Sequence, residues 1–113
     1  MSATSLKERQ RAIALINAYG ALLTETQARI MENYYFYDLS LAEIAEQDGI
    51  SRAAVSEAIK NALAKMEEFE SKLGLVSKKQ KEEDALAKIC KIEDPSMRLK
   101  AFDEYVEGLK NGI

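Results

Sequence analysis

The fold of this chain is decided by one stretch near its middle, which reads Leu41-Ala42-Glu43-Ile44-Ala45-Glu46-Gln47-Asp48-Gly49-Ile50-Ser51-Arg52-Ala53-Ala54-Val55. Two helices that cross closely need a small residue where their backbones approach, and Ala45 fills that place. Gly49 tolerates the positive φ of a sharp turn, and Ser51 is a good N-cap for the helix that follows. Val55 supplies a branched anchor for the core. Together these residues predict a helix-turn-helix.

The segments on either side repeat their apolar residues every three and four positions, which is typical of amphipathic helices. Gly20 is expected to stop the first helix. The helix starts are marked by capping residues at Ser5, Thr24, Ser40, Ser51, Ser77 and Asp94. We expect an all-α fold with no strand and with helices over 5–19, from Thr24 past Tyr35, over 41–48, from Ser51 to about Leu73, from Ser77 to near Ile92, and from Pro95 past Leu109.

The helix that begins at Ser51 carries an apolar stripe longer than a three-helix core needs. Its distal residues Met66, Phe69 and Leu73 require a cover, which either residues 86–109 or a second copy of the chain could supply. We therefore expect a helix-turn-helix domain over residues 1–75, with a long recognition helix. Residues 76–113 are expected to form a C-terminal extension of two additional helices, packed on the core or on a second chain as a homodimer.

Composition excludes several classes of protein. The chain of 113 residues is 47% apolar, which is enough for a core without disulfides or metals. It contains no His, no Trp and one Cys, which excludes zinc fingers, disulfide scaffolds and Cys/His nucleophile pairs. No glycine-rich phosphate-binding motif is present. We therefore expect no catalytic, cofactor-binding or metal-binding residues and no enzyme activity, with Cys90 as a small buried hydrophobe.

The sequence contains neither an apolar segment long enough to span a membrane nor the pattern of a secretory signal. No apolar run approaches the length of about 18 residues that a membrane span needs. Residues 1–9 lack the apolar stretch of a secretory signal. A cytoplasmic location is expected.

The charge pattern predicts that any nucleic-acid binding involves one face of the protein and not its whole surface. The chain carries a net charge of −3, whereas phosphate neutralisation dominates nucleic-acid affinity. Most of the excess acid lies in residues 24–50. The outward face of the recognition helix is the candidate nucleic-acid-binding site, and it consists of Arg52, Ala53, Ser56, Glu57 and Lys60. Arg52, Ser56 and Lys60 could contact phosphates or base edges, while Glu57 would repel a phosphate backbone.

A run of aromatic residues, Tyr34-Tyr35-Phe36-Tyr37, closes the segment before this motif. Such residues could stack on the bases of single-stranded RNA. We favour packing in the core and at its boundary, because aromatic side chains at helical spacing bury area first.

The motifs carry a resemblance to two families. Thr24-Glu25-Thr26-Gln27, Asp38-Leu39-Ser40-Leu41-Ala42-Glu43-Ile44-Ala45 and Gly49-Ile50-Ser51-Arg52 resemble the fourth region of bacterial sigma factors, which binds a promoter element. Residues 5–75 more closely resemble the YlxM family of small bacterial proteins, on the segments Tyr19-Gly20-Ala21-Leu22-Leu23-Thr24, Tyr34-Tyr35-Phe36-Tyr37-Asp38-Leu39-Ser40-Leu41, Ala54-Val55 with Ile59-Lys60, and Lys72-Leu73-Gly74-Leu75. The resemblance fades over residues 76–113.

The resemblance implies a non-enzymatic accessory or regulatory role in the signal recognition particle pathway of protein export, because YlxM genes typically neighbour those of the particle's GTPase and its receptor. The implied partners are the particle's protein or its RNA. Asp48 departs from both families, which usually place Leu or Phe there, under the turn. We expect that Asp48 caps a helix or faces out, or that the turn is reshaped.

Two further functions remain open. A sequence-specific transcription regulator would bind duplex DNA with Arg52, Ser56 and Lys60. A helical protein-protein interaction module would have kept the helix-turn-helix shape and lost DNA binding, which Glu57, Asp48 and the acidic segment 24–50 favour.

Overall fold

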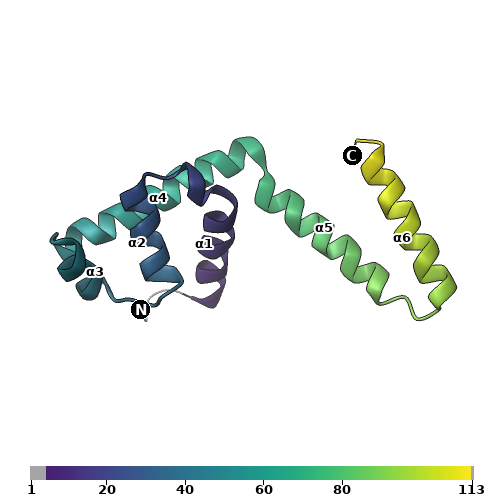
Figure 1. Ribbon diagram of the computed structural model, residues 1–113, viewed down its shortest axis with the longest axis horizontal. Helices are drawn as coiled ribbons and strands as arrows, with labels where there is room; N and C mark the ends of the chain where they lie inside the picture. The colour runs from purple at the N-terminus through teal and green to yellow at the C-terminus, as the bar shows by residue number, and fades with distance from the viewer. Residues whose placement is uncertain (1–4, 113) are drawn as a thin grey trace. The chain divides into compact units, whose positions relative to one another are not determined.

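The computed structural model describes residues 5–112, and these form helices and connecting turns without a strand (Figure 1). The all-α prediction is therefore confirmed. Residues 1–4, which begin the stretch examined for an export signal, and residue 113 lie outside the described part. The elements in chain order are α1 (Leu6–Tyr19), the 3-10 helix η1 (Gly20–Leu22), α2 (Glu25–Tyr35), α3 (Leu41–Asp48), α4 (Arg52–Leu73), α5 (Leu75–Cys90) and α6 (Pro95–Lys110).

Most helices begin where the capping residues predict. The Thr24 and Ser40 side chains accept hydrogen bonds from the backbone three residues later, and Gln27 and Glu43 return the bond to the cap N–H in two capping boxes. Ser5 and Ser51 cap α1 and α4 by accepting a hydrogen bond from the N–H three residues later, and Asp94 caps α6 by accepting one from the Ser96 N–H, with Pro95 at the start of α6. Local sequence is sufficient to place these starts, because each cap bonds to amides in its own first turn.

One predicted boundary is confirmed and one is wrong. α1 ends at Tyr19 with Gly20 as its C-cap, as predicted, although Gly20 has right-handed backbone angles (φ −55°, ψ −34°) and begins the 3-10 helix η1. Ser77 does not cap a helix, because α5 already begins at Leu75. The first amides of α5 are bonded from elsewhere: the Leu75 N–H donates to the Tyr19 hydroxyl (3.1 Å) and the Val76 N–H to the Glu70 carboxylate (2.9 Å).

The chain divides into two compact units, residues 1–76 and 77–113. Unit 1 contains the core, to which α1, α2, α3 and α4 all contribute. Its largest fully buried side chains are Tyr19, Leu15, Ile30, Met31, Ile44, Met66 and Val55. This core holds α4 at the surface of unit 1 with one side against the other helices, so its opposite side is available to solvent.

Part of the distal apolar stripe of α4 is covered by α1. Met66 is fully buried, and the Phe69 ring lies against the Tyr19 ring with centroids 6.0 Å apart. The packing of residues 76–113 on the core or on a second chain stays a prediction. Leu73, at the end of α4, remains 58% exposed.

Unit 2 consists of most of α5 together with α6, and neither helix has a buried residue. Cys90 is exposed, so its prediction as a buried hydrophobe is wrong. The physical reason is that two helices alone do not enclose a side chain, even on an apolar stripe. Among residues 5–112, every helix is too short or too polar to span a lipid bilayer.

Candidate nucleic-acid interface

The turn between α3 and α4 has the backbone that the sequence predicts. Gly49 adopts the left-handed conformation (φ 67°, ψ 34°), which a residue with a Cβ enters at a cost. Its N–H and that of Ile50 donate to the last carbonyls of α3, with Ile50 bonded to Ala45 at 3.0 Å. Ser51 then accepts a hydrogen bond from the Ala54 N–H at 3.0 Å and starts α4. The two helices are thereby fixed as a helix-turn-helix.

The five predicted site residues lie together on one exposed strip of α4. The strip consists of Arg52, Ala53, Ser56, Glu57 and Lys60, all exposed. Within residues 5–112, no hydrogen bond or ion pair holds the side chains of Arg52, Ser56, Glu57 and Lys60. The strip is therefore a free surface with two cations and one carboxylate.

Asp48 takes a position that the sequence did not predict. Its side chain is only 8% exposed, and a carboxylate oxygen lies 3.0 Å from Nη2 of Arg29 on α2. The residue neither faces out nor reshapes the turn, because Gly49 keeps its left-handed conformation. The ion pair lets a carboxylate occupy a packed position under the turn.

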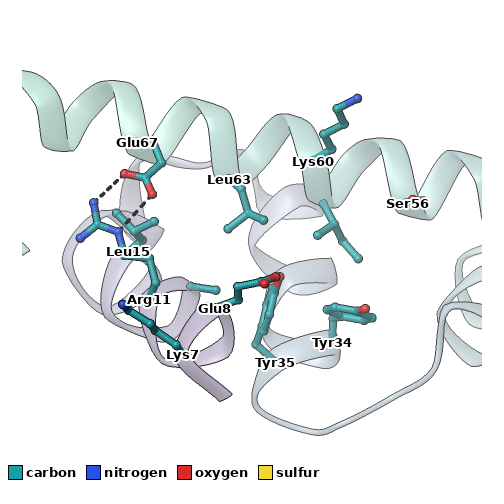
Figure 2. A pocket seen from close by; sticks show the side chains of 12 residues that line it. Lys7, Glu8, Arg11, Leu15, Tyr34, Tyr35, Ser56, Lys60, Leu63 and Glu67 are labelled. Atoms are coloured by element: carbon teal, nitrogen blue, oxygen red, sulfur yellow. Dashed lines mark hydrogen bonds and ion pairs between the residues drawn. The ribbon is translucent and has the colours of Figure 1, made fainter. Parts of the chain in front are cut away.

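A groove of about 610 Å³ adjoins the strip and lies between α1, α2 and α4 (Figure 2). Ser56 and Lys60 form part of its α4 side, so the groove and the strip share two residues. The full lining is Lys7, Glu8, Arg11, Ala12, Leu15, Tyr34, Tyr35, Ser56, Ile59, Lys60, Leu63 and Glu67. Figure 2 shows Tyr34 at the end of the groove near Ser56, and Lys7, Arg11 and Glu67 at the other end.

The charged residues of the groove are unequally paired. The Arg11 guanidinium donates twice to Glu67, from Nε at 3.1 Å and from Nη2 at 2.7 Å. This hydrogen bond raises the pKa of Arg11 further above its ordinary value. Lys7 and Lys60 have no acidic partner within residues 5–112. Figure 2 shows the Lys60 ammonium directed away from Tyr34.

Arg9 holds the aromatic end of the groove in place. Its Nη2 donates to the Tyr35 carbonyl at 2.6 Å and lies 3.1 Å from the Asp38 carboxylate. Asp38 has a φ of 60°, a left-handed conformation that is uncommon outside glycine. The Arg9 bonds therefore fasten α1 to the turn that follows α2.

The aromatic run is only partly packed. Tyr35 is buried, and this burial raises the pKa of its phenol, while Tyr34 is half-buried against it. The two rings meet edge to face with centroids 4.9 Å apart. Phe36 and Tyr37 are 42% and 70% exposed, contrary to the packing prediction, because α2 ends at Tyr35 and the turn carries them outward.

Sequence reasoning did not place Lys7, Glu8 and Arg11 at the candidate site. Lys7 and Arg11 lie one helical turn apart on α1, a spacing that puts them on one face. Nothing in the sequence indicates that this face adjoins Ser56 and Lys60, because that contact joins residues far apart in the chain. Only the packing of α1 on α4 brings them together.

Comparison with known proteins places these features in a family. Residues 6–107 match the UPF0122 family model, described as "Putative helix-turn-helix protein, YlxM / p13 like". A UPF0122 protein of Symbiobacterium thermophilum is 46% identical over 104 residues, which cover 92% of this chain and 82% of the relative. One of Clostridium kluyveri is 43% identical over 108 residues, covering 96% of each chain. One of Halalkalibacterium halodurans is 42% identical over 95 residues, covering 84% of this chain and 87% of the relative.

The match extends further than the sequence resemblance suggested. It runs through α5 and most of α6, whereas the expected resemblance ended near residue 75. With a helix-turn-helix in unit 1 and relatives that span nearly the whole chain, this protein belongs to the UPF0122 family of YlxM-like helix-turn-helix proteins.

Proposed function

We propose that this chain binds nucleic acid through the exposed strip of α4 and acts in the cytoplasm as a non-enzymatic accessory or regulatory protein of the signal recognition particle pathway. One observation carries the nucleic-acid part of the proposal: the strip Arg52, Ala53, Ser56, Glu57 and Lys60 is exposed, and no side-chain bond within residues 5–112 occupies it. In helix-turn-helix proteins this surface of the second helix contacts the nucleic acid.

The resemblance to YlxM proteins supports the particle as the partner, through its RNA, its protein or both. The charge on the strip also favours a small contact over the reading of a long duplex. Arg52 and Lys60 are its two cations, and Glu57 lies between them in sequence. Few phosphate contacts give a weak and weakly salt-dependent affinity for duplex DNA. A structured RNA needs fewer such contacts, because shape and unpaired bases contribute to its recognition.

The test is a filter-binding comparison of the particle's RNA, random RNA of equal length and duplex DNA, each at two salt concentrations. We expect the full chain to bind the particle's RNA most tightly. The double variant Arg52→Ala with Lys60→Ala should weaken this binding and reduce the slope of log affinity against log salt by roughly 0.7–0.9 for each lost phosphate contact. The matched control is Lys88→Ala with Lys100→Ala, which removes the same charge from exposed positions of unit 2.

Each outcome decides between functions. Equal affinity for the particle's RNA and random RNA, or a slope unchanged in the α4 variant, would contradict the proposal. Tightest binding to one duplex DNA sequence would instead support a transcription regulator.

A protein-protein interaction module is the second candidate, and the carboxylates near the motif favour it. Glu46 and Glu57 are exposed, whereas Asp48 no longer contributes because it is paired with Arg29. A pull-down with the purified protein of the particle, with and without ribonuclease, separates the two readings. If the particle's protein is still captured after ribonuclease treatment, and is not captured by the double variant Glu46→Gln with Glu57→Gln, the interaction module is supported.

A further inference from the structure

We propose that the groove between α1, α2 and α4 binds a short single strand, with one unstacked base against the Tyr34 ring and a phosphate further along the strand at Lys7 and Arg11. The inference rests on the proposed function and specifies the form of nucleic acid that the chain selects. A single-stranded loop can place a base in such a groove, whereas a duplex keeps its base faces stacked.

The Tyr34 ring is the stacking surface, and it is held in a fixed orientation. Tyr34 is half-buried and lines the groove. Its ring meets the buried Tyr35 at an interplanar angle of 90°, and Arg9 fixes the Tyr35 backbone through a 2.6 Å hydrogen bond to the carbonyl. An aromatic ring that is already ordered loses little conformational entropy when a base stacks on it.

The floor of the groove suits a planar apolar ligand. Its apolar part is the partly buried Leu63 of α4, backed by the buried side chains of Ala12, Leu15 and Ile59. The volume of about 610 Å³ is in the range of small-molecule sites in proteins. The groove can therefore hold a base and its sugar, while the chain on either side continues into solvent.

The cations at the other end of the groove suit a phosphate. Lys7 has no acidic partner within residues 5–112. Arg11 uses Nε and Nη2 for Glu67, and the N–H groups of its other nitrogen remain for a phosphate oxygen. Glu8 is the one lining carboxylate without an ion pair in the described part of the chain, and it opposes an anion. Cations exceed carboxylates in the lining, although the chain as a whole carries −3.

The experiment measures fluorescence anisotropy of the full chain with 5′-fluorescein hexanucleotides of RNA and of DNA, and with a labelled 12-base-pair duplex. Loss of base stacking costs about 1–3 kcal/mol, so Tyr34→Leu should weaken single-strand binding by about five-fold to 150-fold. Duplex binding should stay within about two-fold, because the duplex does not enter the groove. Tyr34→Phe should bind like the parent, since the stacking face is kept.

Three further variants supply a control and a test of the effect of charge. Tyr37→Leu removes a tyrosine that is 70% exposed and lies outside the groove, and it should leave affinity unchanged. Glu8→Gln removes the opposing charge at an exposed position and should tighten single-strand binding by about two-fold to five-fold, while Lys7→Gln weakens it. The RNA and DNA hexanucleotides show whether the sugar is also selected.

The results separate this inference from the proposed function. Equal effects of Tyr34→Leu and Tyr37→Leu, or looser binding in Glu8→Gln, would overturn the groove as a nucleotide site. If the α4 double variant still weakens binding to the particle's RNA, the proposed function stands without the groove. If Tyr34→Leu lowers capture of the particle's protein and leaves hexanucleotide binding unchanged, the groove binds protein, which also overturns the inference. Thermal unfolding of Tyr34→Leu, followed by circular dichroism, shows whether the variant is folded.

Discussion

At the scale of single residues, the ion pair between Asp48 and Arg29 shows how a carboxylate is kept beneath a helix-turn-helix. The Asp48 side chain is 8% exposed, but the Arg29 side chain is 46% exposed. The cost of removing Asp48 from water is therefore not fully offset, because the attraction to a partly solvated partner is weakened. The capping residues could be predicted because their partners lie two or three positions away. The partner of Asp48 could not, because Arg29 lies on another helix.

We predict that an apolar side chain is tolerated at position 48. Asp48→Leu should change the free energy of unfolding by less than about 1.5 kcal/mol, and towards greater stability, because the new side chain is buried and the half-exposed Arg29 stays solvated. Asp48→Ala should lower the free energy of unfolding by about 1–2 kcal/mol, because it removes the pair and fills no space. Urea unfolding measures both, and a Leu variant less stable than the Ala variant would contradict the argument.

A second prediction concerns the capping box at the start of α3. The Ser40 N–H donates to the Glu43 carboxylate at 2.9 Å, and this bond lowers the pKa of Glu43 below its ordinary value of 4.5. The unfolded chain then binds a proton more readily, so the stabilisation is present above the ordinary pKa and is lost as the pH falls through the lowered one. Glu43→Gln should reduce the loss of stability as the pH falls through 4.5 and below.

The matched control for that titration is Glu46→Gln on the same helix, whose exposed side chain makes no hydrogen bond within residues 5–112. Urea midpoints at several pH values compare both variants with the parent. Equal pH dependence in all three chains would show that the cap carboxylate does not contribute.

At the scale of elements, helix starts were predictable wherever a cap acts within its own turn, and α5 is the exception. Its first amides donate to the Tyr19 hydroxyl and to the Glu70 carboxylate, which α1 and α4 supply. The Tyr19 hydroxyl itself donates to Glu70 at 2.5 Å, and burial together with this bond raises the pKa of Tyr19. No local pattern encodes such a start, so the sequence favoured Ser77.

We predict that Tyr19→Phe loosens the start of α5 and leaves the core packed. The ring against Phe69 is kept, while the Leu75 N–H loses its acceptor. Hydrogen exchange of the Leu75 and Val76 amides should become about five-fold to ten-fold faster, and exchange in α2 should be unchanged. Uniformly faster exchange through unit 1 would show that the hydroxyl supports the whole core.

At the scale of the whole molecule, the fold class could be predicted from the sequence. Which element packs over the apolar stripe of α4 could not. Apolar spacing indicates that α4 has a long buried stripe, but it does not say which element covers it. Tyr19 provides part of that cover, and the buried residues of the core all belong to unit 1. For the same reason the groove could not be predicted, since its residues come from three helices. The predicted homodimer stays a prediction.

We predict that a chain ended after residue 80 keeps the fold of unit 1. Its buried residues all lie between Ala12 and Met66, so its unfolding midpoint should stay within about 5 °C of the main transition of the full chain. In a peptide of residues 77–113, α6 and the remaining part of α5 contain no buried residue, and helices of this length are marginal alone. Circular dichroism should show low helicity at micromolar concentration. Helicity that rises with concentration would indicate that a second copy of the peptide covers the apolar residues of α5 and α6. Sedimentation of the full chain then measures its oligomeric state.

The exposed thiol of Cys90 affects how any such assembly can be studied, because it is the single cysteine of the chain. A maleimide dye can attach there without engineering, which gives one reporter at a known position of each molecule. The same accessibility allows two molecules to become covalently linked in air. Association must therefore be measured with a reductant present, or an oxidation product will be mistaken for a specific complex.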